Sequence, residues 1–144
     1  MSTVLKISEA CSIAIHAMLV LATNADKTLL ARDIASILHV SESHLQKVLQ
    51  RLVRSSLVSS VRGPNGGFYL NGKNGNIRLI DIYEAIEGRF ISNDCLFERS
   101  VCGKKKCVFD KLLKKVNGVF YRYLSSTSLK QSVKRTGGGE PWKI

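Results

Sequence analysis

Apolar residues recur every three or four positions along the N-terminal third of the chain, a spacing typical of half-buried α-helices. The spacing predicts a first helix that begins after Ser8, its N-cap, and a second helix that ends at Leu38. A third helix has the clearest start, because Ser41 stands at the N-cap position and Val40 and Leu45 form a hydrophobic staple around it. The tight connection between the second and third helices is typical of a helix-turn-helix.

The hydrophobic period shortens after the third helix. Residues 57–62 and 68–70 are typical of two β-strands that flank a turn. The turn is made of Gly63, Pro64, Asn65, Gly66 and Gly67. A further helix is expected around residues 80–86, closed by Gly88 as its C-cap. This order predicts a mainly α fold, a winged helix-turn-helix over residues 1–88 with a small β-hairpin as its wing.

The rest of the chain divides into three parts. Residues 89–107 show no hydrophobic periodicity and hold three of the four cysteines. A long C-terminal helix is predicted from about Val108 to Leu124, within a segment 108–133. Because its apolar stripe lies beyond a domain that already has a core, we expect it to form a dimer interface. The stripe consists of Leu112, Leu113, Val116, Val119, Phe120 and Tyr123. Residues 134–144 contain three consecutive glycines and are predicted to be disordered.

The charge of the chain narrows the class of partner. There are 22 lysines and arginines against 11 acidic residues, a formal net charge of +11. This excess indicates nucleic acid or an anionic membrane as the partner, although charge alone also keeps a protein in solution. No apolar run reaches the roughly 18 residues of a membrane-spanning helix, and no signal peptide pattern is present. We therefore expect a cytoplasmic protein that binds double-stranded DNA and no membrane.

The polar face of the third helix supplies the candidate DNA-reading residues. Hydroxyl, amide and cationic side chains are the types that bond to base edges and phosphates. The residues expected to approach the major groove are Ser41, Ser43, His44, Gln46 and Lys47. Those expected to meet phosphates are Gln50, Arg51 and Arg54. Arg62, at the base of the glycine-rich turn, is a candidate for a narrow minor groove. A solvated helix face is the alternative interpretation of the same pattern.

The loop cysteines are the second chemical signal. Six residues separate Cys95 from Cys102, and four separate Cys102 from Cys107. This spacing matches neither a zinc knuckle nor a ferredoxin. Cationic neighbours lower thiol pKa values and stabilise the thiolates that a metal needs. The three thiols are therefore candidate metal ligands, with unliganded thiols as the alternative. Cys11 lies on the apolar stripe of the first helix and is assigned to the core.

Two segments carry a resemblance to a known family. Residues 59–70, Ser-Ser-Val-Arg-Gly-Pro-Asn-Gly-Gly-Phe-Tyr-Leu, resemble the wing of the Rrf-two family of transcriptional regulators. Residues 80–88 resemble the segment that follows this wing, and the similarity extends from about residue 7 to 129. The family includes an iron–sulfur cluster regulator and a nitric-oxide-sensitive repressor. The resemblance implies a homodimeric repressor joined by its C-terminal helix. It also implies an iron–sulfur cluster, 2Fe–2S or 4Fe–4S, that is held by the cysteine loop and tunes affinity for a dyad-symmetric operator.

The resemblance leaves the fourth cluster ligand open. Three residues after Cys107, where the iron–sulfur cluster regulator has a histidine, this chain has Asp110. The first-helix position that supplies a carboxylate in some relatives is Ser12. His16, one turn further on, matches a histidine ligand in one branch of the family. His16 and Asp110 are therefore the candidate fourth ligands.

Two other functions are weighed against this prediction. An enzyme is not expected, because no Gly-x-Ser-x-Gly, His-Glu-x-x-His or phosphate-loop motif accompanies the three histidines. A clusterless regulator of the same fold, responding to a partner protein or to cysteine oxidation, is the second alternative.

Overall fold

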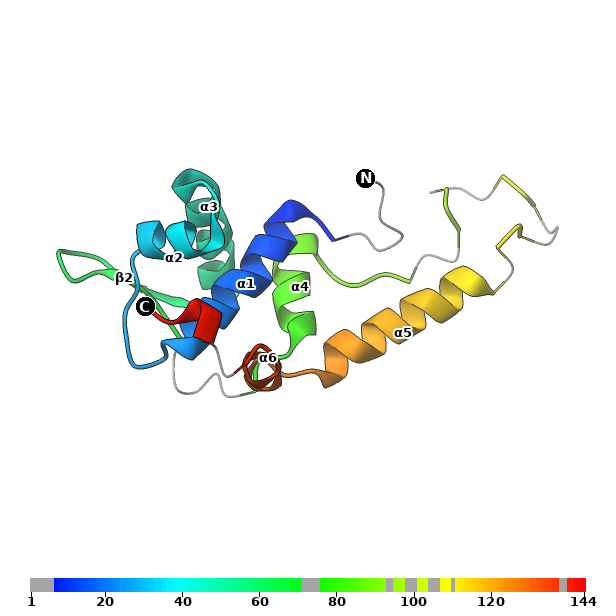
Figure 1. Ribbon diagram of the computed structural model, residues 1–144. Helices are drawn as coiled ribbons and strands as arrows, with labels where there is room; N and C mark the ends of the chain where they lie inside the picture. The colour runs from blue at the N-terminus through cyan, green and yellow to red at the C-terminus, as the bar shows by residue number, and fades with distance from the viewer. Residues whose placement is uncertain are drawn as a thin grey trace.

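The computed structural model describes residues 7–70, 76–92, 95–97, 101–103, 107–109, 111–137 and 140–144. Helices dominate, and one antiparallel hairpin projects beside α2 and α3 (Figure 1). The elements in chain order are α1 (Glu9–Thr23), α2 (Ala31–Leu38), α3 (Glu42–Arg54), β1 (Ser59–Val61), β2 (Gly67–Tyr69), α4 (Leu79–Glu87), α5 (Leu112–Ser126), α6 (Leu129–Arg135) and the short 3-10 helix η2 (Glu140–Trp142). This architecture confirms the predicted winged helix-turn-helix. None of the described helices combines the length and apolar character that a membrane crossing needs.

The first helix, α1, forms the centre of the core. It contacts α2, α3, α4 and α6, so most of its circumference is covered. Its buried residues are Cys11, Ile13, Ala14, Ala17, Met18, Leu19, Val20 and Leu21. A helix that is apolar nearly all round is stable in water only when neighbours surround it, as they do here. The Ser8 hydroxyl accepts a bond from the Cys11 N–H at 3.1 Å, which confirms Ser8 as the N-cap.

The helix-turn-helix is formed by α2 and α3. The connection turns sharply because His39 adopts a left-handed backbone conformation, with φ at 53°. Ser41 caps α3 as expected, since its hydroxyl accepts a bond from the His44 N–H. On α3 the residues Leu45, Val48, Leu49 and Leu52 are buried, which leaves the opposite face in solvent.

The wing is a two-stranded hairpin that a third segment holds in place. Ser59 pairs with Tyr69 and Val61 with Gly67, so the first strand is shorter than predicted and the second begins and ends one residue earlier. Phe68 also forms two backbone hydrogen bonds with Leu29, at 2.8 and 2.9 Å. The hairpin is thereby tied to the segment that joins α1 to α2, which fixes the wing relative to the helix-turn-helix.

The long C-terminal helix begins later and ends later than predicted. The apolar stripe predicts a start near Val108, whereas α5 begins at Leu112. Val108 is 92% exposed and precedes a turn closed by a bond from the Leu112 N–H to the Phe109 carbonyl oxygen. Phe120 packs edge-on against Tyr83 of α4 at 5.8 Å. The outer part of α5 extends away from the winged domain (Figure 1).

The C-terminal segment differs from the prediction of a disordered tail. Lys134 and Arg135 complete α6, and residues 140–144 lie against α1. The buried side chain of Asn24 donates to the Trp142 carbonyl oxygen at 2.8 Å and accepts from the Ile144 N–H at 3.1 Å. A buried amide needs such partners, and the half-buried Trp142 ring adds apolar contact. The glycine run signalled flexibility, but contacts distant in sequence order the residues after it.

Candidate nucleic-acid interface and cysteine loop

The solvent-facing side of α3 presents a continuous row of hydrogen-bonding side chains. Ser43, Lys47, Gln50 and Arg54 are all exposed and follow one another at helical spacing. In the described part of the chain, neither Lys47 nor Arg54 forms a hydrogen bond or an ion pair with protein. We name these four residues the α3 row. Donors and cations of this kind, without protein partners, are available to bases and phosphates.

Two other α3 side chains already have partners within the protein. The Gln46 amide donates to the Glu42 carboxylate at 3.1 Å, one helical turn away. The Arg51 guanidinium, at the edge of the α3 row, donates to the backbone carbonyl oxygen of Ile86 near the end of α4. Arg51 is therefore engaged on the protein side of the helix face, unlike Arg54.

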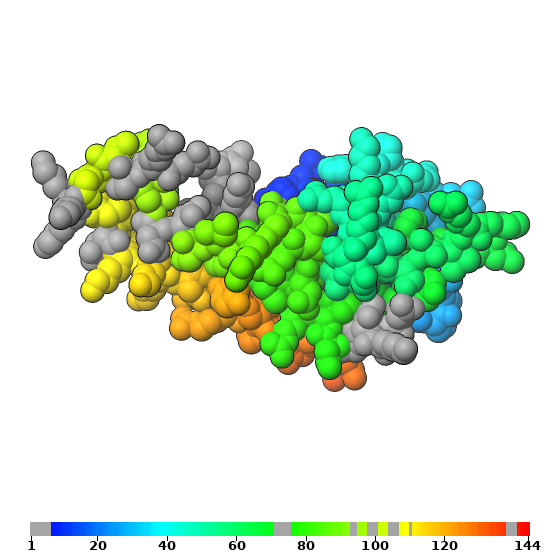
Figure 2. All heavy atoms as spheres, turned by 180° about the vertical axis from the view of Figure 1, so that it is seen from behind, coloured from blue at the N-terminus to red at the C-terminus, as the bar shows by residue number. Residues whose placement is uncertain are grey.

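The hairpin tip lies on the same face of the molecule as α3. Figure 2 shows the tip as the green projection at the right, next to the cyan and teal spheres of α3. Arg62, Gly63, Pro64 and Asn65 are all exposed. The tip is narrow because Gly66 lies close to the opposite strand, where a Cβ atom would be 2.4 Å from the Val61 carbonyl oxygen. A slim, backbone-rich tip with one arginine suits the minor groove.

Replacing Gly67 with alanine is expected to destabilise the wing. Gly67 has φ at +143°, and an added Cβ would lie 2.4 Å from the Leu29 carbonyl oxygen. We expect Gly67→Ala to lower the free energy of unfolding by about 1–3 kcal/mol, measured by urea denaturation. Gly118→Ala is the matched control, because a Cβ there meets no atom within 4 Å and alanine favours a helix. Equal unfolding free energies for the two variants would contradict this account.

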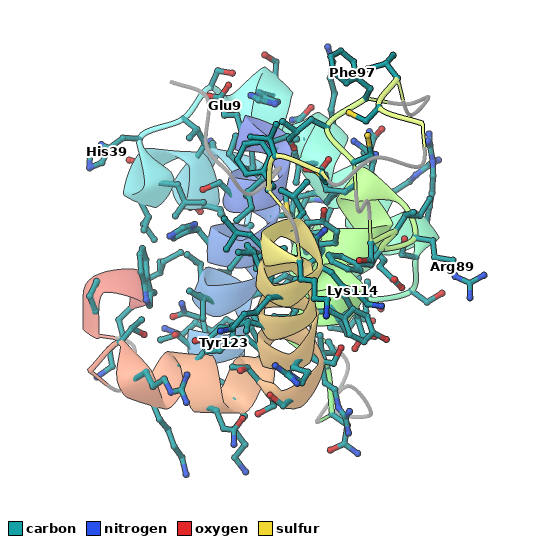
Figure 3. The ribbon with its side chains drawn as sticks, turned by 90° about the vertical axis from the view of Figure 1, so that its right-hand side faces the viewer. Glu9, His39, Arg89, Phe97, Lys114 and Tyr123 are labelled. Atoms are coloured by element: carbon teal, nitrogen blue, oxygen red, sulfur yellow. The ribbon has the colours of Figure 1, made fainter. Side chains whose placement is uncertain are left out.

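The loop cysteines are free thiols at the protein surface. Cys102 is exposed, and Cys95 and Cys107 are half-buried. Large apolar side chains accompany them: Leu96, Phe97 and Val101 are each more than 60% exposed. Figure 3 shows Phe97 in this loop near the outer end of α5, with Arg89 pointing away from the body. Within the described residues, no three histidine, cysteine or carboxylate side chains come together as a metal site. Cysteine thiols are suitable ligands for iron. In the described residues, however, they do not converge with other donors on one point.

The fourth cysteine, Cys11, is a core residue, as the sequence predicted. Its side chain is fully buried. Burial, together with the negative charge of Glu87, raises the pKa of the Cys11 thiol to about 11. Cys11 is therefore a neutral thiol at physiological pH and does not supply a thiolate.

The family is decided by comparison with known proteins. A family model described as "Rrf2: Iron-dependent Transcriptional regulator" matches residues 7–135. The chain belongs to the Rrf2 family. YffB of Lactococcus lactis, named as an HTH-type transcriptional regulator, is 34% identical over 139 residues, 92% of this chain and 89% of that protein. This is a family of transcriptional regulators and not of enzymes, as the sequence analysis expected.

Solved structures of Rrf2 proteins share the fold. The global cysteine regulator CymR of Bacillus subtilis has a TM-score of 0.75 and 27% identity, covering 91% of this chain and 98% of that one. An IscR structure from T. potens has a TM-score of 0.71 and 26% identity, covering 94% and 91%. The similarity therefore extends through α5 and α6 and is not confined to the winged domain.

Within this Rrf2 chain, the two candidate fourth ligands have different positions. Asp110 lies outside the described residues. His16 is exposed on α1, where its Nδ1 atom is 2.7 Å from the Ser12 carbonyl oxygen and its ring meets Trp142 edge-on. Because a carbonyl oxygen only accepts, the hydrogen of the neutral ring lies on Nδ1. The Nε2 atom then keeps a free lone pair, and a neutral imidazole of this kind can bind a metal. In Figure 1 the described part of the cysteine loop lies beyond the outer end of α5, apart from α1, the helix that carries His16.

Three contacts that shape the site were missed by the sequence analysis. They are the pairing of Leu29 with Phe68, the docking of Trp142 on α1, and the bond from Arg51 to α4. Each joins segments far apart in the chain, so no local spacing indicates them. A fourth contact, from Gln46 to Glu42, was within reach of sequence analysis, since residues four apart on a helix are neighbours.

Proposed function

We propose that this Rrf2 chain recognises its operator by inserting α3 into the major groove of DNA and placing the hairpin tip on the adjacent backbone or minor groove. The observation that supports the proposal is the α3 row, four exposed polar residues beside a projecting wing. Residues near the start of the helix, Ser41, Ser43, His44, Gln46 and Lys47, would face base edges, as in other helix-turn-helix proteins. Gln50 and Arg54 would face phosphates.

Arg62→Ala tests the wing contact. The side chain is exposed at the hairpin and supports no core residue, so its loss should leave the fold intact. We expect operator affinity to fall about tenfold or more, since hydrogen bonds to charged groups are the stronger class. Fluorescence anisotropy with labelled operator measures this. Lys134→Ala, which removes the same charge from exposed α6, is the control and should bind as wild type does. Equal losses in both variants would mean that only the overall charge matters.

We further propose that the chain acts as a homodimeric repressor joined through α5. Only Leu124 of α5 is buried, and a groove of about 460 Å³ runs along the helix. The groove is lined by Leu112, Lys115, Val116, Val119, Phe120 and Tyr123. A second copy of the same helix would cover this apolar surface in an isologous interface. Two α3 helices related by a two-fold axis require a dyad-symmetric operator.

For the cysteine loop we propose an iron–sulfur cluster as the regulatory cofactor. The supporting observations are three free thiols in one surface loop and the iron-dependent description of the Rrf2 family. Cys95, Cys102 and Cys107 would hold the cluster as thiolates, with His16 of the partner subunit or Asp110 as the fourth ligand. When bound, such a cluster supplies a redox- and nitric-oxide-sensitive group. The loop that carries the three cysteines connects the end of α4 to the start of α5, so it would anchor the cluster between these two helices in the chain.

Serine replacement tests this cofactor. Anaerobically reconstituted protein is expected to contain iron and sulfide and to absorb visible light, and each of Cys95→Ser, Cys102→Ser and Cys107→Ser should lose that absorbance. The operator affinities of the three variants should converge on that of cluster-free wild type. Cys11→Ser is the matched control and should keep the cluster, because this thiol is buried and neutral. Wild-type protein that binds no iron, or loop variants with a full spectrum, would contradict the proposal.

The second candidate is a clusterless regulator that responds to thiol oxidation or to a partner protein. It is favoured by the exposure of Cys102 and by the absence of three converging donors among the described residues. The similarity to a protein named as a global cysteine regulator also supports it. Colourless protein whose operator affinity changes after treatment with a disulfide-forming oxidant would support this candidate over the cluster.

A further inference from the structure

The end of α4 is a junction where three parts of the chain meet. Arg51 of α3 donates to the Ile86 carbonyl oxygen. The Ser8 N–H, at the start of α1, donates to the Glu87 carboxylate at 3.0 Å. The Phe90 N–H, where the cysteine loop begins, donates to the Glu84 carboxylate at 2.9 Å. The proposed recognition helix, α3, and the base of the cysteine loop are therefore hydrogen-bonded to the same last turn of α4.

The hydrogen bond from Arg51 to the Ile86 carbonyl oxygen helps to fix the orientation of α3 relative to α4. The last carbonyl groups of a helix have no partner within it, and a cation near them is favoured by the helix dipole. Arg51 supplies both the hydrogen bond and the charge at α4. The guanidinium is a planar, pre-organised fork of donors, so less conformational freedom is lost in forming this hydrogen bond than with a lysine ammonium. Because Arg51 stands at the edge of the α3 row, this bond sets how the row faces outward.

The base of the cysteine loop also packs against α5. The Phe90 ring lies 5.1 Å from Tyr121 and 6.1 Å from Phe120, centroid to centroid, and it also contacts Tyr83 of α4. A change in the loop that displaces Phe90 would therefore displace the last turn of α4. Through Arg51 that displacement would reach α3.

We propose that Arg51 is a positioning residue for DNA recognition: it ties α3 to the end of α4, so that the state of the cysteine loop sets the orientation of the recognition helix. The inference rests on the proposed DNA-binding function. It assigns Arg51 a role distinct from the phosphate contact that its charge and exposure suggest. Arg51 acts through α4 and does not touch DNA.

The salt dependence of operator binding distinguishes the two roles. A lysine or arginine on a phosphate contributes about 0.9 to the slope of log affinity against log salt, so losing one from each subunit lowers the slope by about 1.8. Arg54→Gln, which removes a cation without a protein partner, should show this drop. Arg51→Gln should weaken binding by about tenfold and leave the slope at its wild-type value. Because Arg51 is largely exposed, the substitution removes no core contact.

A double-mutant cycle tests the connection to the loop. Glu84→Ala removes the acceptor for the Phe90 N–H. If Arg51 and Glu84 act through one junction, the double variant should bind operator about as weakly as Arg51→Gln alone. Thermal unfolding of each variant is measured first, and cooperative transitions near that of wild type are expected.

The outcomes separate the inference from the proposed function. A slope that falls by about 1.8 in Arg51→Gln would make Arg51 a phosphate contact and overturn the inference. An operator affinity of Arg51→Gln equal to that of wild type would also overturn it. So would a double variant whose loss of affinity equals the product of the two single losses, or an Arg51→Gln protein with no cooperative unfolding transition. A flat salt dependence in wild type, or an unaltered slope in Arg54→Gln, would instead contradict the proposed DNA interface.

Discussion

Raising the salt concentration from 50 to 200 mM is expected to weaken operator binding about a thousandfold. A dimer that places Lys47, Arg54 and Arg62 on DNA twice makes six cationic contacts. Six contacts correspond to a slope of about −5 in log affinity against log salt. The formal net charge of +11 per chain adds to the long-range attraction. Fluorescence anisotropy titrations at four or five salt concentrations measure the slope.

The same titration on a scrambled duplex of equal length is the control. Non-specific binding should show a comparable slope with lower affinity, because phosphate contacts carry no sequence information. A slope close to zero for the operator would contradict the placement of the α3 row and the hairpin tip on DNA.

Val116→Glu is expected to convert the dimer into monomers. Val116 lines the α5 groove, and in a dimer its carboxylate replacement would be buried without a partner. Burying an unpaired charge costs several kcal/mol, which corresponds to a loss of dimer affinity of about a hundredfold or more. Sedimentation velocity at micromolar concentration should show a single monomeric species. Operator affinity should fall by orders of magnitude, since each monomer binds one half-site.

Lys114→Glu is the matched control for this substitution. It introduces the same side chain on α5 at an exposed position outside the groove, and it should remain dimeric. Figure 3 shows Lys114 and Tyr123 on α5. A tight Val116→Glu dimer would place the subunit interface elsewhere.

Much of the fold was predictable because it follows from local chemistry. Ser41 caps α3 by a bond to a residue three positions away, and the apolar stripe that begins at Leu45 gives the buried face directly. Gly88 ends α4 with a positive φ, as its position after the apolar stripe indicated. The polar row on α3 was predicted from the same spacing that gave its core face.

The parts that were not predicted depend on contacts between distant segments. Nothing near Leu29 indicates that it pairs with Phe68, because that bond forms only after the hairpin folds back. Trp142 and Ile144 are held by the buried Asn24, whose position at the end of α1 carries no signal of a partner. Arg51 differs from Arg54 only in what lies beside it, and the sequence treats the two alike.

The central claim is that the α3 row and the hairpin tip bind operator DNA. In vitro selection from random duplexes tests it most directly. Wild-type protein is expected to enrich a dyad-symmetric site whose half-sites are centred about one DNA turn or more apart. Lys47→Ala should enrich a site with relaxed preference at one position in each half, because a base-edge contact contributes about 1–3 kcal/mol of discrimination. Enrichment of no sequence, or of the same site with equal stringency by both proteins, would contradict the account.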